Sequence, residues 1–136
     1  MKATRTLGND LAELPATLDW LEAALRAAGV GKEQTDEWRL VAEEGLSNII
    51  RHAYTDGARH SIEVTLELDG GEIELVLRDD GRPFNPLAAP APDLDRPPEE
   101  RPEGGLGVLL LKTLVDRADY RRESGANVLR LARRAN

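Results

Sequence analysis

Residues 61–81 read SIEVTLELDGGEIELVLRDDG, and this stretch decides the fold. Apolar and polar residues alternate on both sides of Asp69-Gly70-Gly71, at the period of two that half-buried strands show. An Asp-Gly pair between two alternating runs is a strong signal for a tight hairpin. The sequence therefore predicts two antiparallel strands, Ser61–Leu68 and a returning strand through Ile73 and Leu77, which share one apolar face.

Two helices are predicted before this hairpin. From Asp10 to Ala28, leucines recur at intervals of three and four residues. Pro15 should lie near the start of that helix, because proline is tolerated in the first turn and not in the interior. The second helix is expected from about Glu33 to Tyr54. Its apolar stripe consists of Ala42, Leu46, Ile49 and Ala53.

The outer segments complete the prediction. Lys2–Leu7 is expected to form an edge strand, and Gly107–Val115 is apolar enough for a buried helix. Tyr120–Glu123 and Asn127–Ala132 should close the chain as a second hairpin. The predicted fold class is α+β, a two-layer sandwich with a mostly antiparallel sheet and helices on one face. Residues 1–136 fit a single domain.

The stretch from Asn85 to Glu103 carries six of the chain's eight prolines, many charges and little periodicity. A loop of about 20 residues without regular structure is unusual inside a compact domain, and such loops often act as lids or binding loops. Its position between two candidate nucleotide motifs favours a lid over a surface linker.

The composition excludes several classes of function. The net charge of −7 argues against general nucleic-acid binding and against an anionic membrane surface. The chain has no cysteine, so disulfides and thiolate metal sites are excluded. No membrane-spanning run and no signal-peptide pattern is present, and the expected compartment is the cytoplasm. A solvated face or a docking patch could be formed by the C-terminal arginines Arg117, Arg121, Arg122, Arg130, Arg133 and Arg134.

Glu44, Asn48 and His52 are spaced four apart in the second predicted helix, so they form a polar stripe beside its apolar one. A carboxamide oxygen is a suitable hard ligand for Mg²⁺. A carboxylate one turn away can take a proton from an attacking hydroxyl. Glu43 projects about 100° around the helix from Glu44, so the two acids should not share a role. The alternative is that Glu44 and Asn48 are ordinary solvated residues.

Two further segments offer nucleotide contacts. Asp79, where the second strand of the hairpin ends, can accept a hydrogen bond from an exocyclic amine, and Gly81 lets a flat ring approach the backbone; a plain turn is the alternative. Gly104-Gly105-Leu106-Gly107 opens an apolar helix, and free N–H groups there attract phosphate. No lysine follows these glycines directly and the spacing differs from G-x-G-x-x-G, so neither a P-loop nor a Rossmann site is expected.

Taken together, the three segments resemble a known superfamily. They are similar, in this order, to the N, G1 and G2 boxes of the GHKL or Bergerat-fold, histidine-kinase-like ATPases. The segments are EEGLSNIIRHAY at Glu43–Tyr54, RDDGRPFNP at Arg78–Pro86 and GGLGVLLLKTLVD at Gly104–Asp116. Within that superfamily the sequence most resembles the bacterial anti-sigma-factor serine/threonine kinases of the RsbW and SpoIIAB type. The resemblance covers nearly the whole chain and implies ATP and Mg²⁺ as cofactors.

The resemblance also implies a role for each matching residue. Glu44 matches the catalytic base, Asn48 the Mg²⁺ ligand, and Asp79 the acid that reads the adenine amine. About residues 85–104 would be the ATP lid. The other positions implied to contact the nucleotide are His52, Gly81, Pro83, Phe84, Gly104, Gly105, Leu106 and Gly107.

Members of this family are typically homodimers that hold a sigma factor inactive. They release it on binding an anti-anti-sigma (STAS-type) protein, which they phosphorylate on serine, so the resemblance implies these partners. Two features depart from the family pattern. Pro83 replaces the second G1 glycine of many superfamily members, and SGANVLRL lacks the usual threonine, for which Asn127 would substitute.

Two other functions stay open at this point. The chain could be a nucleotide-binding module that sequesters a partner without useful kinase activity, or an α+β domain with fortuitous glycine loops. The sequence names neither the client protein nor the serine that would be phosphorylated.

Overall fold

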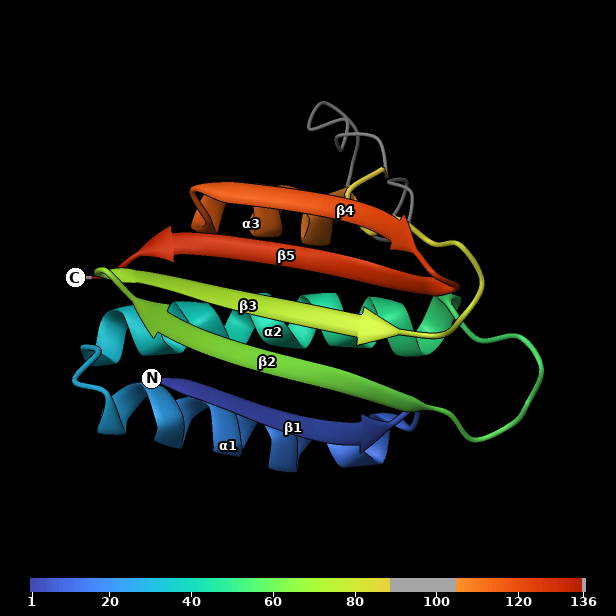
Figure 1. Cartoon of the computed structure of the whole chain (residues 1–136), viewed down its shortest axis with the longest axis horizontal. Helices are drawn as coiled ribbons and strands as arrows, with labels where there is room; N and C mark the ends of the chain where they lie inside the picture. The colour runs from blue at the N-terminus through green and yellow to red at the C-terminus, as the bar shows by residue number, and fades with distance from the viewer. Residues whose placement is uncertain (89–104, 136) are drawn as a thin grey trace.

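The computed structural model describes residues 1–88 and 105–135. Most of the predicted lid, with Gly104, lies outside these described residues. The described chain forms two layers, a five-stranded sheet and a layer of helices that covers one of its faces (Figure 1). This arrangement confirms the predicted α+β sandwich.

All neighbouring strands of the sheet are antiparallel, in the order β1-β2-β3-β5-β4. The strands are β1 (Lys2–Gly8), β2 (Ser61–Asp69), β3 (Glu72–Asp79), β4 (Arg117–Glu123) and β5 (Ala126–Arg134). The predicted β2–β3 hairpin and the β1 edge strand are confirmed. The prediction for β4 was too short, because its first residues are charged or small and carry no apolar alternation; only pairing with β5 defines them.

The helices are α1 (Leu14–Ala27), α2 (Lys32–His52) and α3 (Gly105–Leu114). Pro15 lies in the first turn of α1, as predicted, after a short 3-10 turn at Leu11–Glu13. Figure 1 shows α2 in the middle of the helical layer, between α1 and α3. Within the described ranges, no helix is long and apolar enough to cross a membrane.

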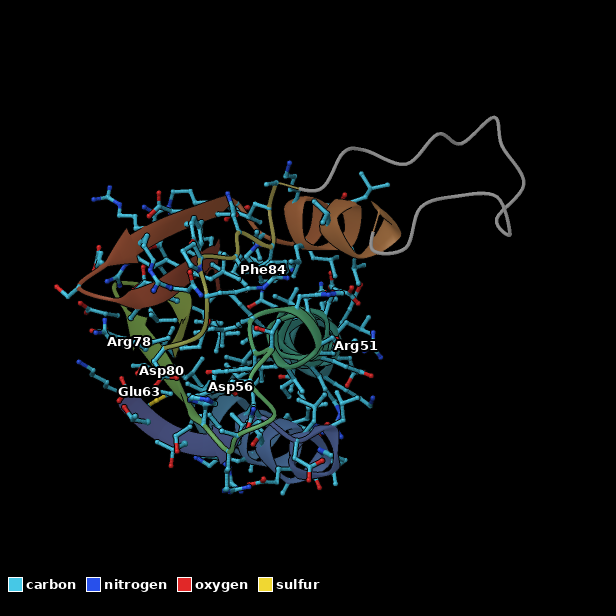
Figure 2. All side chains as sticks on the ribbon, turned by 90° about the vertical axis from the view of Figure 1, so that its right-hand side faces the viewer. Arg51, Asp56, Glu63, Arg78, Asp80 and Phe84 are labelled. Atoms are coloured by element: carbon cyan, nitrogen blue, oxygen red, sulfur yellow. The ribbon has the colours of Figure 1, made fainter. Side chains whose placement is uncertain are left out.

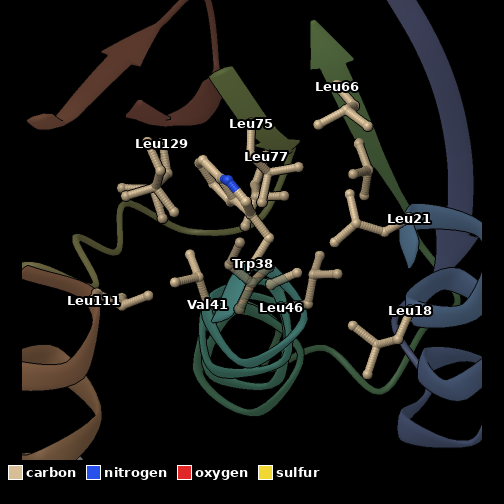
Figure 3. Close-up of a cluster of buried hydrophobic side chains, with 14 of the residues drawn as sticks. Leu18, Leu21, Trp38, Val41, Leu46, Leu66, Leu75, Leu77, Leu111 and Leu129 are labelled. Carbon is tan, nitrogen blue, oxygen red and sulfur yellow. The ribbon is translucent and has the colours of Figure 1, made fainter. Parts of the chain in front are cut away.

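The core lies between α2 and the inner face of the sheet (Figure 3). Trp38 and Leu46 of α2 are at most 1% exposed, and they pack in one cluster with Leu77 of β3 and Leu129 of β5. The stripe predicted for α2 is buried throughout, and Trp38 and Val41 extend it toward the start of the helix. Burial of this stripe sets the rotation of α2 about its own axis, and therefore the direction of its polar stripe.

Helix α3 runs antiparallel to α2. At one end of the pair, Arg133 Nη1 on β5 donates to Glu37 Oε2 at 3.1 Å and to the carbonyl oxygen of Leu114 at 3.3 Å. At the other end, Gly107 of α3 contacts the side chain of Glu44. The start of α3 is therefore held beside the C-terminal half of α2.

We expect the α2–sheet core to determine the stability of the domain. Leu46→Ala removes a fully buried side chain and should lower the free energy of unfolding by about 2–5 kcal/mol. Leu40→Ala is the matched control on the same helix, because Leu40 is 48% exposed, and it should change stability by at most about 0.5 kcal/mol. Urea denaturation of both variants measures the difference; equal losses would contradict the packing described here.

Candidate functional site

The polar stripe of α2 lies at the rim of the core. Asn48 is 7% exposed, and its Nδ2 donates to Glu44 Oε1 at 3.2 Å. Glu44 is half-buried whereas Glu43 is exposed, so the two acids occupy different surroundings, as the helical repeat predicts. The bond uses an N–H of Asn48 and does not involve its carboxamide oxygen, the predicted Mg²⁺ ligand.

Glu44 also contacts the first turns of α3. A Cβ added at Gly107 would lie 1.8 Å from Glu44 Oε1, so a larger residue here would push the flexible Glu44 side chain aside. The N-terminus of a helix carries a partial positive charge and favours a nearby anion. The structure therefore brings together the predicted base and the predicted phosphate-binding helix, which are more than 60 positions apart in the sequence.

Asp79 lies at the end of β3, on the same inner face as Leu77, and is 2% exposed. Its Oδ1 accepts hydrogen bonds from the backbone N–H of Gly81 and from Asn127 Nδ2, both at 2.9 Å. Burial raises the pKa of Asp79, although these two hydrogen bonds and the charge of Arg122 partly oppose the rise. A buried carboxylate with one oxygen already bonded is suited to accept from a donor on a bound base.

The loop after Asp79 packs on the C-terminal end of α2. Arg82 N donates to the carbonyl oxygen of Ala53 at 2.8 Å, and Arg82 Nε donates to that of His52 at 2.7 Å. These carbonyls belong to the end of α2, where intrahelical donors run out. Gly81 fits here because a Cβ would lie only 2.8 Å from the Cβ of Ala53. The His52 and Phe84 rings are tilted, with centroids 5.4 Å apart.

These contacts bring most of the predicted site residues together at one end of the molecule. Figure 2 shows this end along the axis of α2, and Phe84 lies beside the helix. His52, Gly81, Phe84 and Asp79 are linked through one loop, and Pro83 lies on it. A second group consists of Glu44, Asn48 and Gly107. It lies nearer the N-terminus of α2, at least one helical turn before His52. Gly105 and Leu106 open α3, whereas Gly104 lies outside the described residues.

Sequence reasoning missed two contributors to the site, Tyr120 and Arg122 of β4. Arg122 Nη1 donates to the carbonyl oxygen of Gly81 at 2.7 Å, and Tyr120 OH donates to Asn127 Oδ1 at 2.5 Å. Both residues alternate with charged neighbours in a strand without an apolar pattern. Their role follows only from the pairing of β4 with β5.

A second polar cluster adjoins Asp79 on the outer side of the loop. His60 Nε2 lies 2.7 Å from Asp56 Oδ2, and its Nδ1 lies 3.4 Å from Asp80 Oδ1. The His60 ring stacks on Tyr54 at 4.7 Å, and Tyr54 OH donates to Asp80 Oδ1 at 3.3 Å. The hydrogen bond to Asp56 raises the pKa of His60, and burial together with the charges of Asp79 and Asp80 raises that of Tyr54.

The model for the histidine kinase-like ATPase domain matches residues 7–133, and the chain belongs to this family. The chain is similar to the serine/threonine-protein kinase BtrW of Bordetella bronchiseptica, with 35% identity over 92 residues, 68% of this chain and 65% of that protein. It is also similar to the serine-protein kinase RsbW of Bacillus mycoides, with 28% identity over 105 residues, 74% of this chain and 65% of that protein.

The fold also matches a solved structure. The RsbU and RsbW domains of Rv1364c from Mycobacterium tuberculosis superpose with a TM-score of 0.73 at 17% identity, over 99% of this chain and 32% of that one. At this identity the match shows a common fold. The aligned part of this chain spans about two thirds (65%) of the length of the BtrW and RsbW relatives.

The contact between Gly107 and Glu44 can be tested by a double-mutant cycle. Gly107→Ala should stabilise the wild-type protein less than its helix propensity predicts, because the new methyl group pushes aside the flexible Glu44 carboxylate. In the Glu44→Ala background the same change should stabilise α3 by up to about 1 kcal/mol, because alanine is the better helix former. Urea denaturation of the four proteins measures both effects. An equal Gly107→Ala effect in both backgrounds would contradict the contact.

The His60 cluster predicts a pH-dependent contribution to stability. The pKa of His60 in the folded protein is raised above its ordinary value of about 6.5. The stabilisation by the protonated imidazole should therefore be fully present below about pH 6.5. It should be lost as the pH rises through the folded pKa. Thermal unfolding of wild type and His60→Gln between about pH 5 and pH 9 measures the difference, which should shrink toward high pH. A difference that stays constant with pH would show that the imidazolium makes no net contribution.

Proposed function

We propose that the chain is a cytoplasmic, ATP-dependent protein kinase that transfers the γ-phosphoryl group to a serine or threonine of a protein partner. By analogy with the relatives named RsbW and BtrW, the acceptor would be an anti-anti-sigma protein of the STAS type. In the same proposal the chain is a homodimer that holds a sigma factor until the partner binds.

One observation carries the proposal. The Glu44 carboxylate is hydrogen-bonded to Asn48 and lies against the start of α3, so the proposed base, the proposed metal ligand and the proposed phosphate-binding helix end are close together. Asp79 provides a buried acceptor at the end of β3. Phosphoryl transfer depends mainly on positioning and charge stabilisation, and this arrangement can supply both.

The residues present fit a magnesium ion held chiefly by the nucleotide. Mg²⁺ keeps several waters and binds through one or two protein oxygens plus substrate phosphates. Asn48 would provide the protein oxygen, and the ion would neutralise charge on the phosphates. Among the described residues there is no cluster of three or more His, Asp or Glu side chains that could hold a metal.

In this proposal, Glu44 orients the serine hydroxyl of the partner and takes its proton as the hydroxyl oxygen attacks the γ-phosphorus. The bond between the β- and γ-phosphates breaks, and ADP leaves. The N–H groups at the start of α3 would hold phosphate oxygens, and Asp79 would accept a hydrogen bond from the adenine amine. Asn48 fixes Glu44 through its Nδ2, so the base and the metal ligand are positioned together.

Glu44→Ala tests this role directly. We expect the variant to bind Mg-ATP and to lose phosphoryl transfer by about 10²- to 10⁴-fold, the usual contribution of a positioned base. Glu43→Ala is the matched control, because Glu43 is adjacent in sequence and exposed, and it should transfer at the wild-type rate. Calorimetry measures nucleotide binding, and radiolabelled ATP with a STAS-domain acceptor measures transfer.

Two results would overturn the proposal in different ways. Equal transfer by wild type and Glu44→Ala would remove Glu44 from the reaction. Nucleotide binding without transfer by wild type to any candidate acceptor would favour a module that sequesters a partner without kinase activity.

A further inference from the structure

Asn127 connects the predicted base-recognition acid to the rest of the sheet. It lies on β5, is 3% exposed, and is the cross-strand partner of Asp79 on β3 and of Arg122 on β4. Its Nδ2 donates to Asp79 Oδ1 at 2.9 Å and to the carbonyl oxygen of Arg82 at 2.7 Å. One amide group therefore binds both the acid and the loop that follows it.

The carboxamide oxygen of Asn127 is also fully used. It accepts from the backbone N–H of Phe84 at 3.2 Å, from Tyr120 OH at 2.5 Å and from Arg122 Nη1 at 3.2 Å. The opposite amide orientation would place an oxygen against the Asp79 carboxylate and an NH₂ against three donors. The surroundings thus determine the orientation of the side chain.

The side-chain amide of Asn127 has two N–H donors, and both are hydrogen-bonded within the protein. Asn127 therefore has no N–H left with which to contact a ligand. We infer that Asn127 is a positioning residue that sets the specificity for adenine through Asp79. It does so by occupying Asp79 Oδ1 and holding the 82–84 loop, which leaves Oδ2 as the oxygen that would accept from the nucleotide. The inference rests on the proposed nucleotide site and adds to it the residue on which base discrimination depends.

The electrostatics agree with this role. Burial alone favours the protonated form of Asp79, and a protonated carboxyl would accept poorly from an adenine amine. The N–H groups of Asn127 and Gly81 and the charge of Arg122 lower the pKa of Asp79 against that effect. Arg122 is held in place by its bonds to Asn127 Oδ1 and to the Gly81 carbonyl. The β4–β5 hairpin therefore opposes the effect of burial on the pKa of Asp79.

Asn127→Asp separates the two parts of the network. The aspartate keeps an oxygen toward Tyr120, Arg122 and Phe84, and it replaces the donor toward Asp79 by a second acceptor. The 6-oxo group of IDP cannot donate a hydrogen bond to Asp79, whereas the amine of ADP can. We therefore expect the affinity of the variant for ADP to fall toward its affinity for IDP. The ratio of the two affinities should fall at least about tenfold relative to wild type.

Calorimetric titration with ADP and with IDP measures the ratio, which loss of folded protein alone does not change. Leu129→Ala, which truncates a buried residue of the same strand, is the control for destabilisation and should keep the wild-type ratio. A second measurement needs no nucleotide: carbon NMR should show a higher pKa for Asp79 in Asn127→Leu than in wild type.

The outcomes separate this inference from the proposed function. If wild type binds ADP no better than IDP, adenine recognition by Asp79 is wrong, and the NMR titration still decides whether Asn127 controls the Asp79 carboxyl. If wild type prefers ADP and Asn127→Asp keeps that preference, the inference is overturned and the kinase proposal stands. An unchanged Asp79 pKa in Asn127→Leu would also overturn it.

Discussion

Burial of the apolar stripe of α2 against the sheet is the constraint on which the rest of the structure depends. The stripe is rich in side chains that are almost fully buried, Trp38 and Leu46 among them, so the helix can occupy only one rotation about its axis. That rotation places Glu44, Asn48 and His52 toward α3 and the 81–84 loop. The site therefore follows from the hydrophobic core and does not need a ligand to assemble its α2 portion.

The rest of the candidate site is held by polar contacts at two helix ends, the C-terminus of α2 and the N-terminus of α3. The last carbonyls of α2 accept from Arg82, and the Glu44 carboxylate lies at the start of α3. The first contact satisfies carbonyls that α2 leaves without internal partners, and the second places a negative charge near the positive end of the α3 dipole. A nucleotide phosphate that approaches α3 would meet the same N–H groups that now favour Glu44, so binding and the position of the proposed base are linked by geometry.

Much of this arrangement could be predicted, because local patterns report local structure. The Ser61–Asp79 hairpin, the α2 stripe and the separate surroundings of Glu43 and Glu44 follow from periodicities of two and 3.6 residues. The roles of Glu44, Asn48 and Asp79 came from resemblance, and the structure adds that their surroundings suit them. The extent of β4 and the contribution of Tyr120 and Arg122 could not be predicted, since a strand of charged residues carries no apolar signal.

The sequence by itself determined the α+β class, the hairpin, the amphipathic helices and the three motifs, because each depends on residues close together along the chain. Only the tertiary structure decided which of these segments meet. Gly107 lies against Glu44 because α3 packs antiparallel to α2, and Asn127 reaches Asp79 because β5 inserts beside β3. Such contacts join residues far apart in the sequence, 48 positions for Asn127 and Asp79, and their energies depend on packing and register, which no local pattern encodes.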